Sequence, residues 1–144
     1  MTVKAINPAT GEAIREYEQL DRRALEQKIE AAHECFRSWR RTSFEERARL
    51  MNRAAGVLDK NQEKYARLIT REMGKAISEA RSEVAKCAWV CRYYAGHAEA
   101  FLRDEHIETD ASKSFVTHQP LGVVLAVMPW NFPFWQVFRF AAPG

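Results

Sequence analysis

The sequence contains few of the features that mark special classes of protein. It has only six glycines and five prolines in 144 residues, which excludes collagen-like and low-complexity chains. No apolar stretch approaches the roughly 18 residues of a membrane span, and the first residues lack an apolar core of signal-peptide length. We therefore expect no membrane partner and a cytoplasmic location.

An excess of one charge is also missing. The 22 Lys and Arg residues nearly balance 19 Asp and Glu residues, and the net charge is +3. The two signs are mixed along the chain and are not gathered into a basic arm, which argues against nucleic acid as a partner. Hydrophobic residues make up 47% of the sequence, so a chain of this length can bury a sizeable core.

Cysteine and histidine are scarce and lack the spacing of structural sites. The three cysteines are an odd number, and Cys87 and Cys91 are four residues apart in a helical pattern, so they form no disulfide framework and fit a reducing compartment. We expect both to pack in the core as small apolar side chains. The four histidines have no metal-ligand spacing with one another or with the cysteines, and no metal is predicted.

The first 103 residues show turn signals and then helical periodicity. Asn7-Pro8 and Thr10-Gly11 predict an extended segment or a hairpin over residues 1–19. Residues 20–103 read as helices, beginning at Asp21 as a plausible N-cap. The first helix ends near Arg40, and its apolar positions predict one buried face: Leu25, Ile29, Ala32, Phe36 and Trp39.

Three further helices are bounded by local signals. Ser43 opens a capping box with Glu46, and Gly74 is suited to the left-handed conformation that ends a helix. Glu72 and Lys75 flank this glycine and are predicted to be surface and capping residues without a catalytic role. The longest helix is predicted from about residue 76 to 103. Four successive helices also fit a helical bundle.

The pattern changes after residue 104. Residues 114–119 alternate as a strand does, and residues 123–127 form a continuous apolar run that predicts a strand buried on both faces. The string Met128-Pro-Trp-Asn-Phe-Pro133 follows, and then a helix from Phe134 with Pro133 in its first turn. Strand, irregular loop and helix in this order are typical of an open α/β sheet with a site at its strand ends.

Two polar residues in this last region each allow two interpretations. Asn131, between two prolines and two large aromatics, is either an ordinary turn residue or an amide placed for binding. Arg139 shares a helical face with Trp135 among apolar neighbours. It is either a surface side chain whose stem covers apolar groups or an anion receptor that grips a carboxylate.

Several motifs together resemble the aldehyde dehydrogenase family. Ile6-Asn-Pro-Ala-Thr-Gly11 is similar to its opening motif, and Thr70-Arg-Glu-Met-Gly-Lys75 with Glu79 and Glu83 is similar to its Glu-x-Gly-Lys signature. Pro120-Leu-Gly122 resembles the Pro-x-Gly-Val turn before its first core strand. The most specific likeness is Pro129-Trp-Asn-Phe-Pro133.

The resemblance covers the whole chain and implies an α/β fold class. Residues 1–144 would be the amino-terminal part of the aldehyde dehydrogenase fold, a helix-rich segment leading into the first strand of a Rossmann-like parallel sheet. The resemblance divides the chain into four parts. These are the 1–19 segment, the helical part of the nucleotide-binding domain at 20–103, oligomerisation-type strands at 104–119, and the first core strand, loop and start of the next helix at 120–144.

The resemblance also implies roles for individual residues. Asn131 would be the catalytic side-chain donor of an oxyanion hole, and losing such a donor typically costs about 3 kcal/mol of transition-state stabilisation. Met128, Pro129 and Trp130 would lie along the nicotinamide side of an NAD or NADP cofactor. The substrate-binding residues would be Phe132, Trp135 and Arg139, where Arg139 matches the carboxylate-binding arginine of succinate-semialdehyde dehydrogenases.

The implied activity is NAD(P)-dependent oxidation of an aldehyde, succinate semialdehyde by this resemblance, to its carboxylate. The family's phosphate-contacting lysine, general-base glutamate and nucleophilic cysteine follow the region matched here, so the 144 residues alone are expected to be inactive. A complete enzyme would be a homodimer or homotetramer. The alternative is a non-catalytic helical interaction or oligomerisation module.

Overall fold

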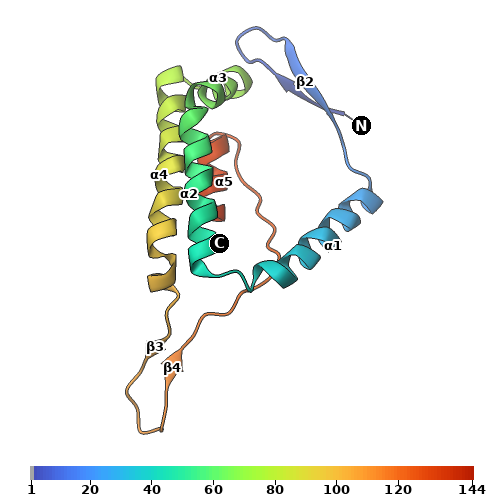
Figure 1. The fold of residues 1–144 in the computed structure, drawn as a ribbon. Coiled ribbons are helices and arrows are strands. Elements are labelled where there is room, and N and C mark those ends of the chain that lie inside the picture. The colour runs from blue at the N-terminus through green and yellow to red at the C-terminus, as the bar shows by residue number, and fades with distance from the viewer. Residues whose placement is uncertain (1) are drawn as a thin grey trace.

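The computed structural model describes residues 2–144, and its helices and strands follow one another as shown in Figure 1. Residue 1 of the predicted 1–19 segment lies outside this range. The elements are β1 (Thr2–Ile6), β2 (Ala13–Glu18), α1 (Arg22–Trp39), α2 (Phe44–Lys60), α3 (Gln62–Met73), α4 (Ile77–Phe101), β3 (Glu105–His106), β4 (Phe115–Val116) and α5 (Pro133–Ala141).

The core lies among α2, α3, α4 and α5. Figure 1 shows α2 and α4 running side by side in opposite directions, with α3 at one end of the pair. Small and β-branched side chains predominate where α4 meets its neighbours, which allows the helices to pack closely. Cys87 and Cys91 are completely buried, as predicted. The core residues are Ala55, Leu58, Ala66, Ile69, Ala80, Val84, Cys87, Ala88 and Cys91.

The helix boundaries agree with the local capping signals. The Asp21 carboxylate accepts a 2.7 Å hydrogen bond from the Ala24 amide, and the Ser43 hydroxyl accepts one from the Glu46 amide. Gly74 ends α3 with a φ of 77°, in the left-handed region. A Cβ at this glycine would lie 3.1 Å from Pro8 Cγ, so the opening hairpin packs closely on this turn.

Two hairpins project from the helical core. β1 and β2 pair antiparallel, with Val3 opposite Tyr17, which confirms the hairpin alternative for the opening segment. β3 and β4 form a shorter antiparallel pair, in which His106 is opposite Phe115, within the region predicted to hold oligomerisation-type strands. Figure 1 shows this second hairpin extending away from the helices.

The prediction of a buried face on the first helix is wrong for this chain. Leu25 and Ile29 are 50% and 55% exposed, Trp39 is also exposed, and α1 has no buried residue. An amphipathic helix buries its apolar face only against another element, and Figure 1 shows α1 standing apart from the helical core. Only Phe36 of the predicted face is half-buried.

The predicted buried strand at 123–127 is likewise not formed within the described residues 2–144. Leu125 and Val127 are 88% and 85% exposed, and residues 117–129 have no regular secondary structure. A strand requires a hydrogen-bonded neighbour. The four strands of the described chain are already paired in two separate hairpins, so this apolar run has no sheet to join.

Candidate active site

The last helix begins two residues after Asn131, at Pro133, and is held at its first turn by a side chain of α4. Pro133 occupies the first position of α5, as predicted, and the N-cap Phe132 has no side-chain oxygen to accept from the free amides. Instead, Glu83 Oε1 accepts hydrogen bonds from the amides of Phe134 at 2.9 Å and Trp135 at 3.1 Å. A carboxylate from a distant part of the chain therefore caps this helix.

The same carboxylate forms a buried ion pair with Lys75. The side chains of Glu83 and Lys75 are only 2% and 6% exposed. Lys75 Nζ also lies 3.6 Å from the centre of the Phe132 ring. The ammonium group, two backbone amides and the positive end of the α5 dipole all compensate the negative charge of Glu83. The ion pair thus contacts both the residue before α5 and its first turn.

The two residues that flank Gly74, Lys75 and Glu72, differ in how they compare with the prediction. Lys75 was predicted to be a surface or capping residue, but its side chain is buried because Glu83 compensates its charge. Glu72 is exposed, as predicted. Glu83 lies on the inner face of α4 with Ala80, Val84 and Cys87. A charged residue within an apolar helical face is the sequence signal that could have indicated a buried ion pair here.

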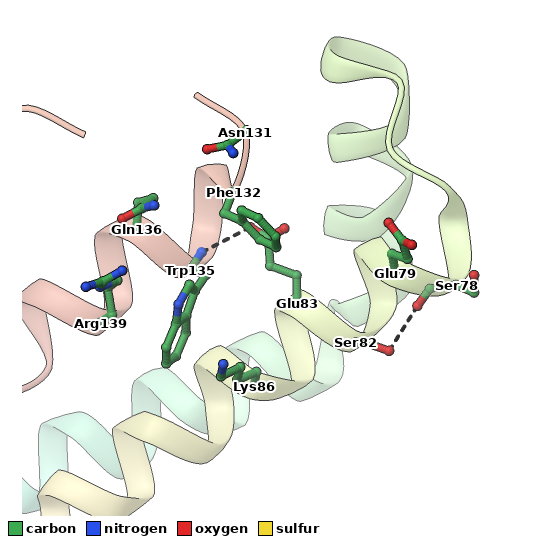
Figure 2. A pocket seen from close by; sticks show the side chains of 10 residues that line it. All are labelled: Ser78, Glu79, Ser82, Glu83, Lys86, Asn131, Phe132, Trp135, Gln136 and Arg139. Atoms are coloured by element: carbon green, nitrogen blue, oxygen red, sulfur yellow. Dashed lines mark hydrogen bonds between the residues drawn. The ribbon is translucent and has the colours of Figure 1, made fainter. Parts of the chain in front are cut away.

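A hollow of about 700 Å³ lies between α4 and α5. Figure 2 shows Asn131 beside the start of α5 and Arg139 further along that helix, with α4 side chains facing them. Trp135 and Arg139 line the hollow together, in agreement with their predicted shared face. The lining residues are Ser78, Glu79, Ser82, Glu83, Lys86, Asn131, Phe132, Trp135, Gln136 and Arg139.

The charges around the hollow favour an anionic group near α5. Arg139 is exposed and forms no ion pair with a carboxylate of the described residues. Lys86 Nζ lies 4.0 Å from the centre of the Trp135 ring, which gives it a favourable cation–π contact. Glu83 is already paired, so Glu79 is the carboxylate on this surface that opposes the two cations.

Four of the seven predicted site residues line the hollow, and three do not. The four are Asn131, Phe132, Trp135 and Arg139. Met128 is half-buried, while Pro129 and Trp130 are exposed, Trp130 by 76%, and none of these three is part of the hollow. The hollow therefore brings together the predicted catalytic and substrate residues but does not include the predicted cofactor residues.

Sequence reasoning missed the part of the hollow contributed by α4. Ser78, Ser82 and Lys86 recur every four residues and form a polar stripe along this helix. The apolar periodicity that predicted the helix drew attention to the opposite side of it. Gln136 was missed because one amide on a short helix carries no distinctive signal.

The cysteines of this chain are unsuited to nucleophilic chemistry at the hollow. Burial, and then the negative charge of Glu83, raise the pKa of the Cys87 thiol to about 12. Burial also raises the pKa of Cys91. Because the thiolate is the reactive form, neither residue is activated. Cys35 is exposed on α1 and does not line the hollow.

The part of the chain that the structure describes contains neither a membrane-spanning helix nor a metal-binding cluster. None of its helices is long and apolar enough to cross a membrane. Among residues 2–144, no three His, Cys, Asp or Glu side chains are grouped so as to hold a metal ion.

Comparisons with known proteins give a consistent family match. Residues 1–144 match the profile described as "Aldehyde dehydrogenase family". A Synechocystis protein named as a probable succinate-semialdehyde dehydrogenase (NADP+) is 50% identical over 144 residues. The succinate-semialdehyde dehydrogenase (NADP+) 1 of Mycobacterium tuberculosis is 45% identical over 147 residues. Both alignments cover 100% of this chain but only 32% of the relative, so the chain spans about a third of their length.

Solved structures agree with the sequence matches. The succinic semialdehyde dehydrogenase of Streptococcus pyogenes, in complex with NADP+, superimposes with a TM-score of 0.93 at 37% identity, over 97% of this chain and 31% of that one. A betaine aldehyde dehydrogenase of Staphylococcus aureus in complex with NAD+ gives 0.90 at 29% identity, over 99% of this chain and 29% of that one.

Proposed function

The chain belongs to the aldehyde dehydrogenase family, and we propose that it is the amino-terminal part of an NAD(P)-dependent enzyme that oxidises succinate semialdehyde to succinate. Its likeness to solved family members confirms the predicted fold class. The curated relatives are named as NADP+ enzymes, whereas one structural relative binds NAD+, so the proposal covers both cofactors.

The observation that carries this proposal is that Asn131 and Arg139 line one hollow. Aldehyde oxidation that begins with addition of a thiolate to the carbonyl carbon requires a donor for the negative charge that develops on the carbonyl oxygen. A substrate that also bears a carboxylate requires a cation some distance from that donor. Asn131 and Arg139 meet these two needs from one short segment of chain.

The amide of Asn131 acts on the carbonyl oxygen of the aldehyde. When a thiolate adds to the carbonyl carbon, the oxygen gains negative charge, and the Asn131 N–H groups donate hydrogen bonds to it. An amide has no proton to lose at neutral pH, so the donor remains in place throughout the reaction. A bound NAD+ or NADP+ would supply the acceptor for the hydride.

Arg139 holds the distal carboxylate of the substrate. Its guanidinium group is exposed at the hollow and can form two parallel hydrogen bonds with a carboxylate. The rings of Phe132 and Trp135 provide apolar surface for the short carbon chain between the two ends of the substrate. Lys86, above the Trp135 ring, adds positive charge nearby.

The residues assigned to the cofactor fit only its nicotinamide end. Met128 and Trp130 offer a thioether and an exposed indole, which suit one face of a planar ring. Met128, Pro129 and Trp130 carry no charge that would bind phosphate. We assign them contacts with the nicotinamide and assign the phosphate contacts to residues outside this segment.

This segment supplies binding and charge stabilisation rather than the nucleophile. Cys87 and Cys91 are buried with raised pKa values, and Cys35 is not at the hollow. We therefore expect the 144 residues alone to produce no reduced cofactor with succinate semialdehyde. All three thiols are free, which supports the cytoplasmic location predicted from the sequence.

The experiment that tests the substrate assignment is a comparison of two aldehydes in the full-length protein. Arg139→Gln should lower kcat/KM for succinate semialdehyde by about 10²-fold, the order of a lost charge-assisted pair, and leave butanal nearly unchanged because it has no carboxylate. Arg71→Gln on the exposed surface of α3 is the matched control. Equal losses on both aldehydes would contradict the carboxylate role.

A second function, assembly with other chains, is favoured by the exposed apolar residues. Ile107, Phe115 and Val116, on and beside the β3–β4 hairpin, are each at least 43% exposed, which is typical of surfaces that another chain covers. We propose that the full-length enzyme is a homodimer or homotetramer and that the β3–β4 hairpin takes part in its interface. Light scattering after size exclusion tests this, and a monomer that retains full activity would contradict it.

A further inference from the structure

The start of α5 is fixed by α4 rather than by its own sequence. The N-cap residue, Phe132, provides no capping side chain, and Glu83 accepts from the amides of Phe134 and Trp135. Figure 2 shows this carboxylate reaching from α4 to the first turn of α5, directly below the loop that carries Asn131. Asn131 is therefore only three residues from an anchored amide.

We propose that Glu83, with Lys75 as its counter-ion, is a positioning residue that fixes the Asn131 amide for oxyanion stabilisation. The inference rests on the proposed function, because it assigns a purpose to Glu83 only if Asn131 is the donor. The Glu83 side chain is only 2% exposed, and both of its oxygens are bonded to Lys75 or to the α5 amides, so we assign it no contact with the reacting atoms. It acts by holding the backbone that immediately follows Asn131.

Two contacts make the anchor unusually firm. Lys75 pairs with Glu83 Oε2 and also lies over the Phe132 ring, so the residue between Asn131 and α5 is held through its side chain. Glu83 Oε1 holds the next amides through the backbone. A backbone held at the residue after Asn131 and again in the first turn of α5 loses much of its freedom there, and a donor must keep its geometry to within a fraction of an ångström to be effective.

The carboxylate also comes from a rigid support. Glu83 lies on α4 beside Ala80, Val84 and Cys87, all completely buried against α2 and α3. A side chain on such a helix is positioned more accurately than one on a loop. The buried ion pair thus fixes the loop that carries the Asn131 amide to a helix packed in the core.

Glu83 needs its negative charge as well as its length to bind Lys75 and the α5 amides at the same time. In Glu83→Gln one side-chain oxygen can still accept from the α5 amides, but the new NH2 group would face the Lys75 ammonium, and two donors cannot bond to each other. The side chain must then give up either the lysine or the amides. Glu83→Asp keeps the charge and shortens the reach by one methylene, so it should keep Lys75 and loosen the α5 amides.

The test begins with kinetics of the full-length protein. We expect Glu83→Gln to lower kcat by about 10- to 100-fold, the range for a donor displaced by about 1 Å, with the KM for aldehyde and cofactor changed by less than about twofold. The loss should be equal for succinate semialdehyde and butanal, since both form the same oxyanion. Glu63→Gln is the matched control, because Glu63 also pairs with a cation on α4, Arg81, but at the surface.

A double-mutant cycle with Asn131→Ala separates positioning from general structural support. If Glu83 acts through Asn131, adding Glu83→Gln to Asn131→Ala should lower kcat by no more than about twofold further. A merely structural role would give the same loss in both backgrounds. Additive losses, or an unchanged kcat in Glu83→Gln alone, would overturn the inference.

Two further readouts keep the result interpretable. If Glu83→Gln does not fold, as judged by near-UV circular dichroism, Glu83→Asp enters the same cycle with the same expected non-additivity. If Asn131→Ala alone leaves kcat unchanged, the proposed oxyanion role itself fails. If Asn131→Ala is impaired and the Glu83 effect is additive, only the positioning role fails.

Discussion

The apolar faces of the two longest helices, α1 and α4, differ in burial. The predicted face of α1 includes Leu25 and Ile29, which are half exposed, whereas Val84 and Cys87 of α4 are completely buried. Both faces follow from the same periodicity in the sequence. The comparison shows that a periodic pattern identifies the side of a helix that needs a partner, while the rest of the chain decides whether that partner is present.

The largest expected difference comes from placing a charge on each of these faces. Val84→Asp should lower the free energy of unfolding by about 4 kcal/mol or prevent folding, because it buries an unpaired carboxylate. Ile29→Asp in the 144-residue chain should change it by less than about 0.5 kcal/mol. Urea unfolding followed by far-UV circular dichroism measures both. Equal destabilisation would show that α1 is packed in solution.

A smaller difference is expected between the buried and exposed ion pairs of α4. Lys75→Met leaves the Glu83 carboxylate with its two amide donors but without its counter-ion, so we expect a loss of about 2 to 3 kcal/mol. Arg81→Met breaks the exposed pair with Glu63 and should leave the urea midpoint unchanged within error. If both variants unfolded at the same urea concentration, burial would not strengthen the Lys75 contact.

Alkaline pH should destabilise the core through Cys87. Its pKa is raised from 9.0 to about 12, so between these values the thiol ionises in the unfolded chain but remains protonated in the folded one. The contribution of the protonated Cys87 thiol to the free energy of unfolding is therefore fully present below pH 9. It decreases as the pH rises, by about 2 to 3 kcal/mol at pH 11. Cys87→Ala should flatten this dependence, whereas Cys35→Ala on exposed α1 should not. Parallel pH profiles for the two variants would exclude the effect.

The smallest expected changes in stability come from replacing each of two glycines with alanine. Gly74→Ala should cost about 1 kcal/mol or more, because alanine is strained at a φ of 77° and its Cβ would approach Pro8 Cγ at 3.1 Å. Gly56 lies inside α2 with nothing within 4 Å of an added Cβ, so Gly56→Ala should stabilise the chain by about 0.5 to 1 kcal/mol. Thermal unfolding of both variants measures the contrast, and a shift in the same direction for both would refute it.

Features that depend on near neighbours were the ones the sequence predicted well. Asp21, Ser43 and Gly74 act within one helical turn, and all three helix boundaries they predict agree with the structure. Pro133 at the start of α5 is a feature of the same kind. Local physical chemistry decides such positions, because capping depends on groups that are three or four residues apart.

Features that depend on distant partners were missed or incorrectly predicted. Glu83 meets the Phe134 amide 51 residues away, and no local pattern connects the two. The apolar run at 123–127 was predicted to be buried, but a strand needs neighbours that the described residues do not provide. At the site, Trp135 and Arg139 could be placed together because they share a helix, whereas Ser82 and Lys86 join them only through packing of α5 on α4.

The oxyanion role of Asn131 can be tested by the single-turnover rate of reduced-cofactor formation in full-length Asn131→Ala. We expect a rate about 10²- to 10³-fold lower than that of the unaltered enzyme, the usual cost of one oxyanion donor, for both succinate semialdehyde and butanal. A rate within about twofold of the unaltered enzyme would contradict this role, because the hollow that contains Asn131 would then not hold the reacting carbonyl.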